Sequence, residues 1–195
     1  PRKVSGVTVE QNWQRITAAL SAHAPATARE IRPPAPAALV ELQRLVGLSF
    51  PADLLAWWAA TDGIDDERDP GGNRDGRLVP DRYVPLGAER AGQEYRRQAE
   101  FPDQDCCVGD THRKAAGSTG FPYCTALVPL CRDSGGGLLG VDLRDGADHG
   151  WIMEWNADEG FHPTDWASVT DLLAEIADRL ELEPVLTEDG ALVWP

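Results

Sequence analysis

The chain contains no apolar run that approaches the roughly 18 residues needed to cross a membrane as a helix, so no membrane span is expected. It also has no charged segment followed by an apolar one at its start, the pattern typical of a signal peptide. Cysteine is scarce, and no Cys-x-x-Cys spacing occurs among Cys106, Cys107, Cys124 and Cys131. Such a set is a poor disulfide framework and favours a cytoplasmic location, where thiols stay reduced.

Basic residues are scarce toward the end of the chain. From Asp142 onward, 14 acidic residues face two basic ones, so this part carries −12 of the net charge of −14. Such acidity repels nucleic acid and anionic membrane surfaces, and neither is expected as a partner. It suits a cationic protein partner whose own surface attracts phosphate. The alternative is that the charge serves solubility alone.

The motifs of common enzyme classes are missing as well. Gly135–Gly137 precede no Lys-Ser/Thr pair and lack the spacing of a dinucleotide site, so a hairpin turn is favoured over a phosphate site. No Gly-x-Ser-x-Gly elbow and no local cysteine signature accompanies the histidines, which are His23, His112, His149 and His162. The sequence therefore predicts no catalytic residues and a protein that is not an enzyme.

A zinc site built from the cysteines and His112 is the alternative to ordinary buried thiols. Cys106 and Cys107 are adjacent, and the gaps to Cys124 and Cys131 are irregular, unlike the paired ligand knuckles of structural zinc sites. We therefore expect scattered, mostly buried thiols, no metal ligands and no cofactor.

The composition is sufficient for one substantial domain. Apolar residues make up 42% of the 195 residues, and no internal repeat is visible, so we expect a single domain over residues 1–195. Some of the seven tryptophans are expected in the core, because a tryptophan buries a large apolar area. The residues that we expect the core to join are Trp13, Leu42, Leu54, Trp58, Val141 and Leu173.

Apolar residues at helical spacing predict five helices. The helices begin at a capping box in Thr8–Gln11, at Pro36, at Pro51, at Ala88 and at a second capping box in Ser168–Asp171. Gly47 ends the second of them and Asp62-Gly63 ends the third. Residues 24–36 are rich in proline and alanine, and they are expected to form an extended linker.

Short strands bounded by turn residues follow in the second half of the chain. They are predicted at residues 83–86, 125–131, 138–143 and 150–155, with hairpin turns at 133–137 and 144–149. Pro85 favours an edge position for the first strand. Residues 64–81 and 101–123 are predicted as long loops, and residues 184–195 as a terminal hairpin. The predicted fold class is α+β, with a mostly antiparallel sheet of about four to six strands packed against helices.

Several short motifs stand in a fixed order between residues 8 and 183. They are Trp13; Phe50, Pro51, Asp53 and Leu54; Asp62-Gly63; Pro85-Leu86; Pro129-Leu130; Gly135–Gly137 with Leu139 and Asp142; Gly150-Trp151-Ile152; and Ser168-Val169 with Leu172-Leu173. In this order they resemble the SUKH superfamily, which includes the Smi/Knr cell-wall assembly regulators of fungi and bacterial toxin-immunity proteins. Two features depart from the pattern: Leu127 stands where the family often has tryptophan, and the loop 101–123 is longer than the resemblance leads us to expect.

The resemblance implies a protein-binding function without catalytic residues. Its leading form is an immunity protein that neutralises a cognate bacterial toxin by stoichiometric binding, with a basic toxin domain as the partner. A regulatory or scaffold protein of the cell-wall-regulator type is the alternative, and an enzyme is a third one.

Partner-binding residues are expected around the last predicted strand. Aromatic side chains surrounded by carboxylates form a surface to which a basic partner can bind well. This combination occurs at Trp151, Glu154, Trp155, Asp158 and Glu159. The alternative is that both tryptophans belong to the core. Asp62 is a further candidate, although an Asp-Gly pair is also a common helix stop.

Overall fold

The structure, a computed structural model, describes residues 6–65, 78–80, 83–108, 111–182 and 190–194. Its helices in these ranges are α1 (Val9–His23), α2 (Pro25–Arg29), α3 (Pro36–Val46), α4 (Ala52–Ala60), α5 (Ala88–Ala99) and α6 (Val169–Leu182). Its strands are β1 (Val84–Pro85), β2 (Cys107–Val108), β3 (Thr111–His112), β4 (Leu127–Arg132), β5 (Leu138–Asp142), β6 (Ile152–Asn156) and β7 (Gly160–Pro163).

The helix ends follow the local sequence. The Thr8 hydroxyl accepts a hydrogen bond from the backbone N–H of Gln11, and the Gln11 side chain accepts one from the backbone N–H of Thr8, which completes the predicted capping box. Gly47 ends α3 with a φ of 70°, a left-handed conformation that favours glycine. At the start of α6, the Ser168 hydroxyl accepts from the backbone N–H of Asp171.

The expected linker at residues 24–36 is wrong in part, because it contains the five-residue helix α2. Pro25 stands in the first turn, where its missing N–H costs no helical hydrogen bond. The C-terminal segment 190–194 lies against this helix: Ala26 donates its N–H to the carbonyl of Gly190, and Leu192 donates to the Thr27 hydroxyl. A contact from a distant segment thus holds a helix that is too short to form alone.

The main sheet is antiparallel, with the strand order β1-β4-β5-β6-β7. Strand β1 lies at an edge, as Pro85 predicted. Strand β7 was not predicted, because its four residues begin with glycine and end with proline and show no alternating pattern. Gly120 pairs with Phe161 on the outer side of β7, so a loop residue covers part of that edge.

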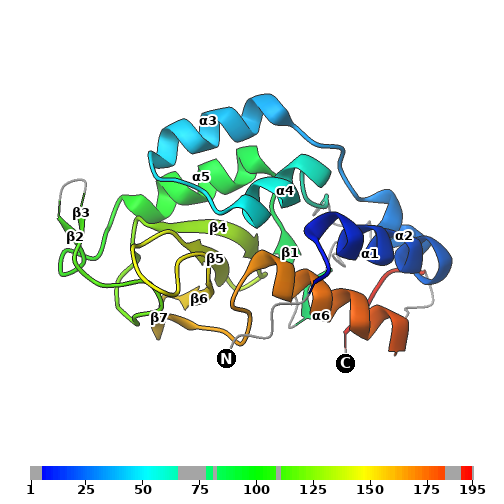
Figure 1. Ribbon diagram of the computed structural model, residues 1–195. Coiled ribbons are helices and arrows are strands. Elements are labelled where there is room, and N and C mark those ends of the chain that lie inside the picture. The colour runs from blue at the N-terminus through cyan, green and yellow to red at the C-terminus, as the bar shows by residue number, and fades with distance from the viewer. Residues whose placement is uncertain (1–5, 66–77, 81–82, 109–110, 183–189, 195) are drawn as a thin grey trace.

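The helices lie in two groups (Figure 1). Helix α5 lies over β4, and α3 lies over α5. Helix α1 packs beside α6 at the other end of the molecule, and α4 lies between the two groups, in contact with α1, α6 and α3. All six residues predicted for the core are buried in one cluster: Trp13, Leu42, Leu54, Trp58, Val141 and Leu173. The described residues thus form a single α+β domain, as the sequence predicted.

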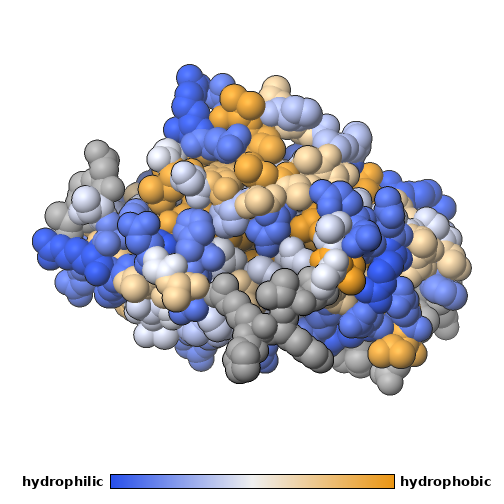
Figure 2. All heavy atoms as spheres, in the orientation of Figure 1, coloured by the Kyte–Doolittle hydropathy of each residue, from blue (hydrophilic) through white to orange (hydrophobic). Residues whose placement is uncertain are grey.

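Most of the face seen in Figure 2 is hydrophilic, with apolar side chains gathered over α3. Val40, on the outer side of that helix, is 61% exposed. No helix in the described ranges has both the length and the apolarity required to cross a bilayer.

The segment at residues 101–123 was predicted as a loop throughout, and this is wrong in part, because it contains two paired strands. Strands β2 and β3 form a small antiparallel hairpin that projects at the end of the molecule opposite α1 and α6 (Figure 1). The two ends of the segment meet, because Pro102 and Tyr123 form a bridge and Asp103 donates its N–H to the carbonyl of Tyr123 at 2.7 Å. Most of the other long loop and of the terminal hairpin, at residues 66–77 and 183–189, lies outside the described residues.

Candidate partner-binding surface

Asp62 has a structural contact in the fold. Its Oδ1 accepts a hydrogen bond at 2.8 Å from the N–H of Ala88, the first residue of α5. The backbones are very close here: a Cβ on Gly63 would lie 2.6 Å from the nitrogen of Gly87, and a Cβ on Gly87 would lie 2.4 Å from the Asp62 carbonyl oxygen. The Asp-Gly pair therefore fixes the start of α5 against the end of α4.

The two candidate tryptophans are both half-buried. The Trp151 indole N–H donates to the carbonyl of Thr164 at 2.8 Å. The Trp155 ring meets the buried ring of Tyr123 edge-on, with 5.7 Å between the ring centroids. Its Nε1 atom is buried and has no hydrogen-bond partner in the described ranges. Both rings are thus engaged in the body of the protein and remain only partly accessible.

Glu154 is tied to its neighbours as well. One carboxylate oxygen accepts a hydrogen bond of 2.7 Å from the hydroxyl of Tyr83, the residue directly before β1. The other oxygen lies 3.4 Å from Nε2 of His162. Burial, helped by the bond to Glu154, raises the pKa of Tyr83 well above its ordinary value. The Glu154 carboxylate is therefore engaged within the fold.

Asp158 and Glu159 are exposed in the turn between β6 and β7. The side-chain oxygen of Asn156 accepts both of their backbone N–H groups, at 3.0 and 2.7 Å, which holds the turn in place. Neither carboxylate forms an ion pair with the residues that the structure describes. The Glu159 carboxylate also accepts a hydrogen bond of 3.2 Å from the Asn156 side chain. Of the predicted candidates, these two present exposed negative charge at the surface.

Two aromatic side chains that the sequence reasoning did not select lie beside this turn. Phe101 is 76% exposed and Phe121 is 59% exposed, and both line a hollow of about 410 Å³ together with Glu100 and Asp105. Phe121 also reaches the β6–β7 turn, since a Cβ on Gly160 would lie 3.0 Å from its ring. Phe121 thus connects this hollow to the β6–β7 turn that carries Asp158 and Glu159.

We call this the acidic–aromatic surface and define it by Phe101, Asp105, Phe121, Asp158 and Glu159. A signal for it exists in the sequence: both phenylalanines precede a proline and lie outside any apolar periodicity. Such residues have no helix or strand face through which to reach the core.

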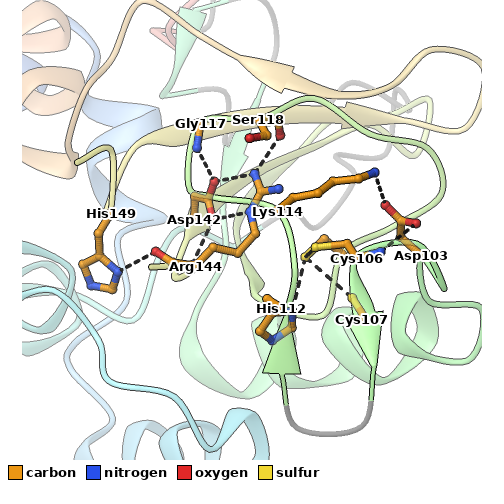
Figure 3. A network of polar contacts seen from close by, with 11 residues as sticks. Asp103, Cys106, Cys107, His112, Lys114, Gly117, Ser118, Asp142, Arg144 and His149 are labelled. Carbon is orange, nitrogen blue, oxygen red and sulfur yellow. Dashed lines mark hydrogen bonds and ion pairs between the residues drawn. The ribbon is translucent and has the colours of Figure 1, made fainter. Parts of the chain in front are cut away.

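Two ion pairs with buried carboxylates lie in and beside residues 101–123 (Figure 3). The Asp103 carboxylate accepts the N–H groups of Asp105 and Cys106, and it pairs with Lys114 at 2.8 Å. Asp142 at the end of β5 accepts the N–H of Gly117 at 2.8 Å and pairs with the fully buried Arg144 at 2.6 Å. Because each carboxylate is nearly inaccessible to water, both require these partners.

The expectation of scattered thiols is wrong. The fold brings Cys106, Cys107, Cys124 and His112 together, with one ligand atom of each within 4.8 Å of the others. Cys131 is buried in β4 and does not belong to this group. Sequence spacing did not reveal the cluster, since it is assembled by the β2–β3 hairpin and by the approach to β4.

Comparison with known families identifies the family to which this fold belongs. No match was found among curated proteins. The model of the SMI1 / KNR4 family (SUKH-1) matches residues 33–175, which include α3, the Asp62-Gly63 stop, α5 and the full main sheet. This range lies within the stretch in which the motifs predicted that superfamily, and it covers well over half of the chain. The chain therefore belongs to the SMI1 / KNR4 family (SUKH-1).

Proposed function

We propose that this protein is a non-catalytic binding module of the immunity type, which neutralises a cognate bacterial toxin by stoichiometric binding. The family and the fold support a protein-binding role, and the chemistry of the surface favours a basic toxin domain as the partner. The immunity protein would cover the toxin's functional face without changing it chemically.

The observation that carries this proposal is the acidic–aromatic surface. Exposed phenylalanines are unfavourable in water unless a partner covers them, and interface centres are rich in aromatic residues. Carboxylates without an internal cation partner surround Phe101 and Phe121 and attract a positively charged protein. A nuclease or another toxin that binds anions would present such a charge.

The proposal places the protein in the cytoplasm, with neither nucleic acid nor a membrane as its partner. All four cysteines are free thiols, which fits a reducing compartment. The net charge of −14 opposes binding to phosphate-rich surfaces.

The aromatic part of the surface is tested by surface-plasmon kinetics, with the protein that co-purifies with this chain as the binding partner. Phe101→Ala and Phe121→Ala are each expected to raise the dissociation rate at least about tenfold, because a buried aromatic anchor contributes about 2 kcal/mol or more to binding. Val40→Ala on α3 is the matched control, since it removes an equally exposed apolar side chain outside this surface. Equal dissociation rates for all four proteins would exclude these phenylalanines from the interface.

The charged part is tested by reversing Asp105, Asp158 and Glu159 to lysine. Association is expected to slow by about 10-fold or more at low salt and to approach the wild-type rate at high salt, because steering is screened. The control reverses Glu41, Glu89 and Asp178, which lie on α3, α5 and α6 and change the net charge by the same amount. Glu154 is left intact because of its bond with Tyr83.

If both triple variants slow association equally, the acidity acts through net charge alone and the binding face lies elsewhere. If the only partner recovered is a regulatory protein of the host cell, the scaffold role replaces the immunity role.

A further inference from the structure

The cluster of Cys106, Cys107, His112 and Cys124 has a shape that packing alone does not require. The Sγ atoms of Cys106 and Cys107 each lie 3.7 Å from Sγ of Cys124. Nδ1 of His112 lies 3.7 Å from the same sulfur. Four potential ligand atoms therefore surround one point, and Figure 3 shows the His112 and Cys107 side chains turned toward it from the two strands of the hairpin.

These separations agree with tetrahedral zinc coordination. With Zn–S bonds of about 2.3 Å and Zn–N bonds of about 2.0 Å, two sulfur ligands lie about 3.8 Å apart, and a sulfur and a nitrogen lie about 3.5 Å apart. The distances from the central Cys124 to the other three atoms are close to these values. A set of three cysteines and one histidine is a common structural zinc site.

The local fold prearranges the four side chains. A turn closed by Asp103 sets Cys106 and Cys107, because Asp103 accepts the backbone N–H groups of both. Cys107 and His112 are paired residues of β2 and β3, which places them side by side. The N–H of Thr125 points at Sγ of Cys107 at 3.4 Å, a contact that would stabilise a thiolate there.

One buried positive charge acts on the cluster. Zinc with three thiolates and one neutral imidazole has a net charge of −1. Burial raises the pKa of the Cys124 thiol, and the buried cation Arg144 acts in the opposite direction. The Nη1 atom of Arg144 is buried without a hydrogen-bond partner among the described residues.

We propose that Cys106, Cys107, His112 and Cys124 bind one Zn²⁺ ion as a structural site. All four positions come from the protein, which leaves no open position for a substrate. Each cysteine gives up its proton on binding, and the ion joins the β2–β3 hairpin to the residues that lead into β4. The site thereby fixes the segment that carries Phe101 and Phe121.

A disulfide is the competing chemistry, and the geometry favours zinc over it. Three thiols meet at the site, so any single disulfide leaves one cysteine unused and the histidine without a role. Cys106 and Cys107 lie equally far from Cys124, which selects neither of the two pairs that include Cys124.

The test is elemental analysis of the full chain purified without chelator, together with Co²⁺ exchange. We expect one zinc per chain, and a Co²⁺ spectrum with the strong visible bands of tetrahedral coordination and thiolate charge transfer. Removal of the zinc is expected to lower the Tm by about 5–10 °C, the shift that corresponds to loss of a ligand near 100 times its Kd.

Cys107→Ser and His112→Gln are the test variants, because these two positions are only half-buried and tolerate change better than Cys106 or Cys124. Each is expected to lose more affinity than the roughly 10- to 100-fold lost with an outer-shell partner. Cys131→Ala and His162→Gln, which remove a thiol and an imidazole outside the cluster, are expected to retain full zinc content.

A metal-free wild-type protein with an octahedral Co²⁺ spectrum would overturn the proposal. So would variants that retain zinc like the controls, or a disulfide between Cys124 and Cys106 or Cys107 in protein alkylated at the moment of cell lysis. If a variant does not fold, the wild-type Co²⁺ spectrum decides alone.

Discussion

Different kinds of interaction stabilise the two ends of this molecule. At one end, α1, α4 and α6 meet through apolar side chains, and Trp13 meets Trp57 edge-on with 4.9 Å between the ring centroids. At the other end, a buried ion pair outside residues 101–123 attaches this segment by hydrogen bonds, since Asp142 accepts the N–H of Gly117 and Arg144 donates to the carbonyl of Ser118. Apolar contact tolerates small shifts, whereas a buried ion pair requires its partner in place.

This difference separates the scaffold from the surface that we propose for binding. The helices and sheet can keep one fold across sequences that preserve apolar periodicity. The segment at residues 101–123 can present side chains such as Phe101 to water because it does not depend on them for its attachment.

The largest effect is expected from Asp142→Ala. This change removes the carboxylate that holds Gly117 and leaves the Arg144 guanidinium buried without its counter-charge. Breaking one side of a buried pair costs about 3–5 kcal/mol. Urea unfolding measures it, with the exposed Asp165→Ala as the control. A loss below about 1 kcal/mol would show that water reaches Arg144 and that the segment is attached in another way.

Leu54→Ala tests the apolar end. Leu54 is fully buried in α4, and its truncation is expected to lower the free energy of unfolding by about 2–5 kcal/mol. The neighbouring Leu55 is only partly buried, so Leu55→Ala should cost distinctly less in the same urea titration. A loss under about 0.5 kcal/mol would be typical of a surface position and would contradict the packing described for Leu54.

A smaller, pH-dependent effect is expected where α1 meets α6. Arg15 pairs with Glu181 and Asp178, both at 2.6 Å, and its hydrogen bond holds the pKa of Glu181 below the ordinary 4.5. Because the folded-state pKa is the lower one, this stabilisation is present above 4.5 and is lost as the pH falls through the folded-state value.

Arg15→Gln should therefore lower the urea midpoint at pH 7 and have a shrinking effect as the pH falls below the ordinary carboxyl pKa. Arg44→Gln is the control, since its partner Glu41 lies on the same helix and joins no second element. A constant difference between wild type and Arg15→Gln across this pH range would assign the effect to packing instead of charge.

The smallest effect on stability is expected from the residues proposed for binding. Phe101→Ala and Phe121→Ala should each change the free energy of unfolding by less than about 0.5 kcal/mol, because both rings are mostly exposed. The same variants are the ones expected to weaken toxin binding. A large loss of stability would mean that the rings support the segment, and the contrast between its surface and its attachment would then fail.

The features that the sequence revealed depend on contacts close along the chain. Helix starts such as Thr8, the helix stop at Gly47 and the edge strand at Pro85 follow from backbone conformations that a few neighbouring residues determine. Periodicity was sufficient to place Leu54 and Val141 in the core.

The features that the sequence did not reveal depend on contacts between residues that are far apart in the sequence. Cys107 and Cys124 come together because β2 pairs with β3 near the start of β4. The number of residues between the two cysteines does not indicate this contact. Helix α2 likewise forms against a distant segment, at Gly190, whereas β7 pairs with the neighbouring β6 and is bridged by the distant Gly120 on its outer edge. The partner-binding role of Asp62, Trp151 and Trp155 stays a prediction. Each of these residues also makes a contact within the fold.

The bridge between Pro102 and Tyr123 has an evolutionary consequence. A segment that leaves and re-enters the scaffold at one point can be lengthened, shortened or exchanged at a modest entropic cost, since closing a loop becomes only slightly harder as it grows. If the proposed function holds, exchange of residues 103–122 would exchange the recognition surface, while α5 and β4 on either side remain where they are.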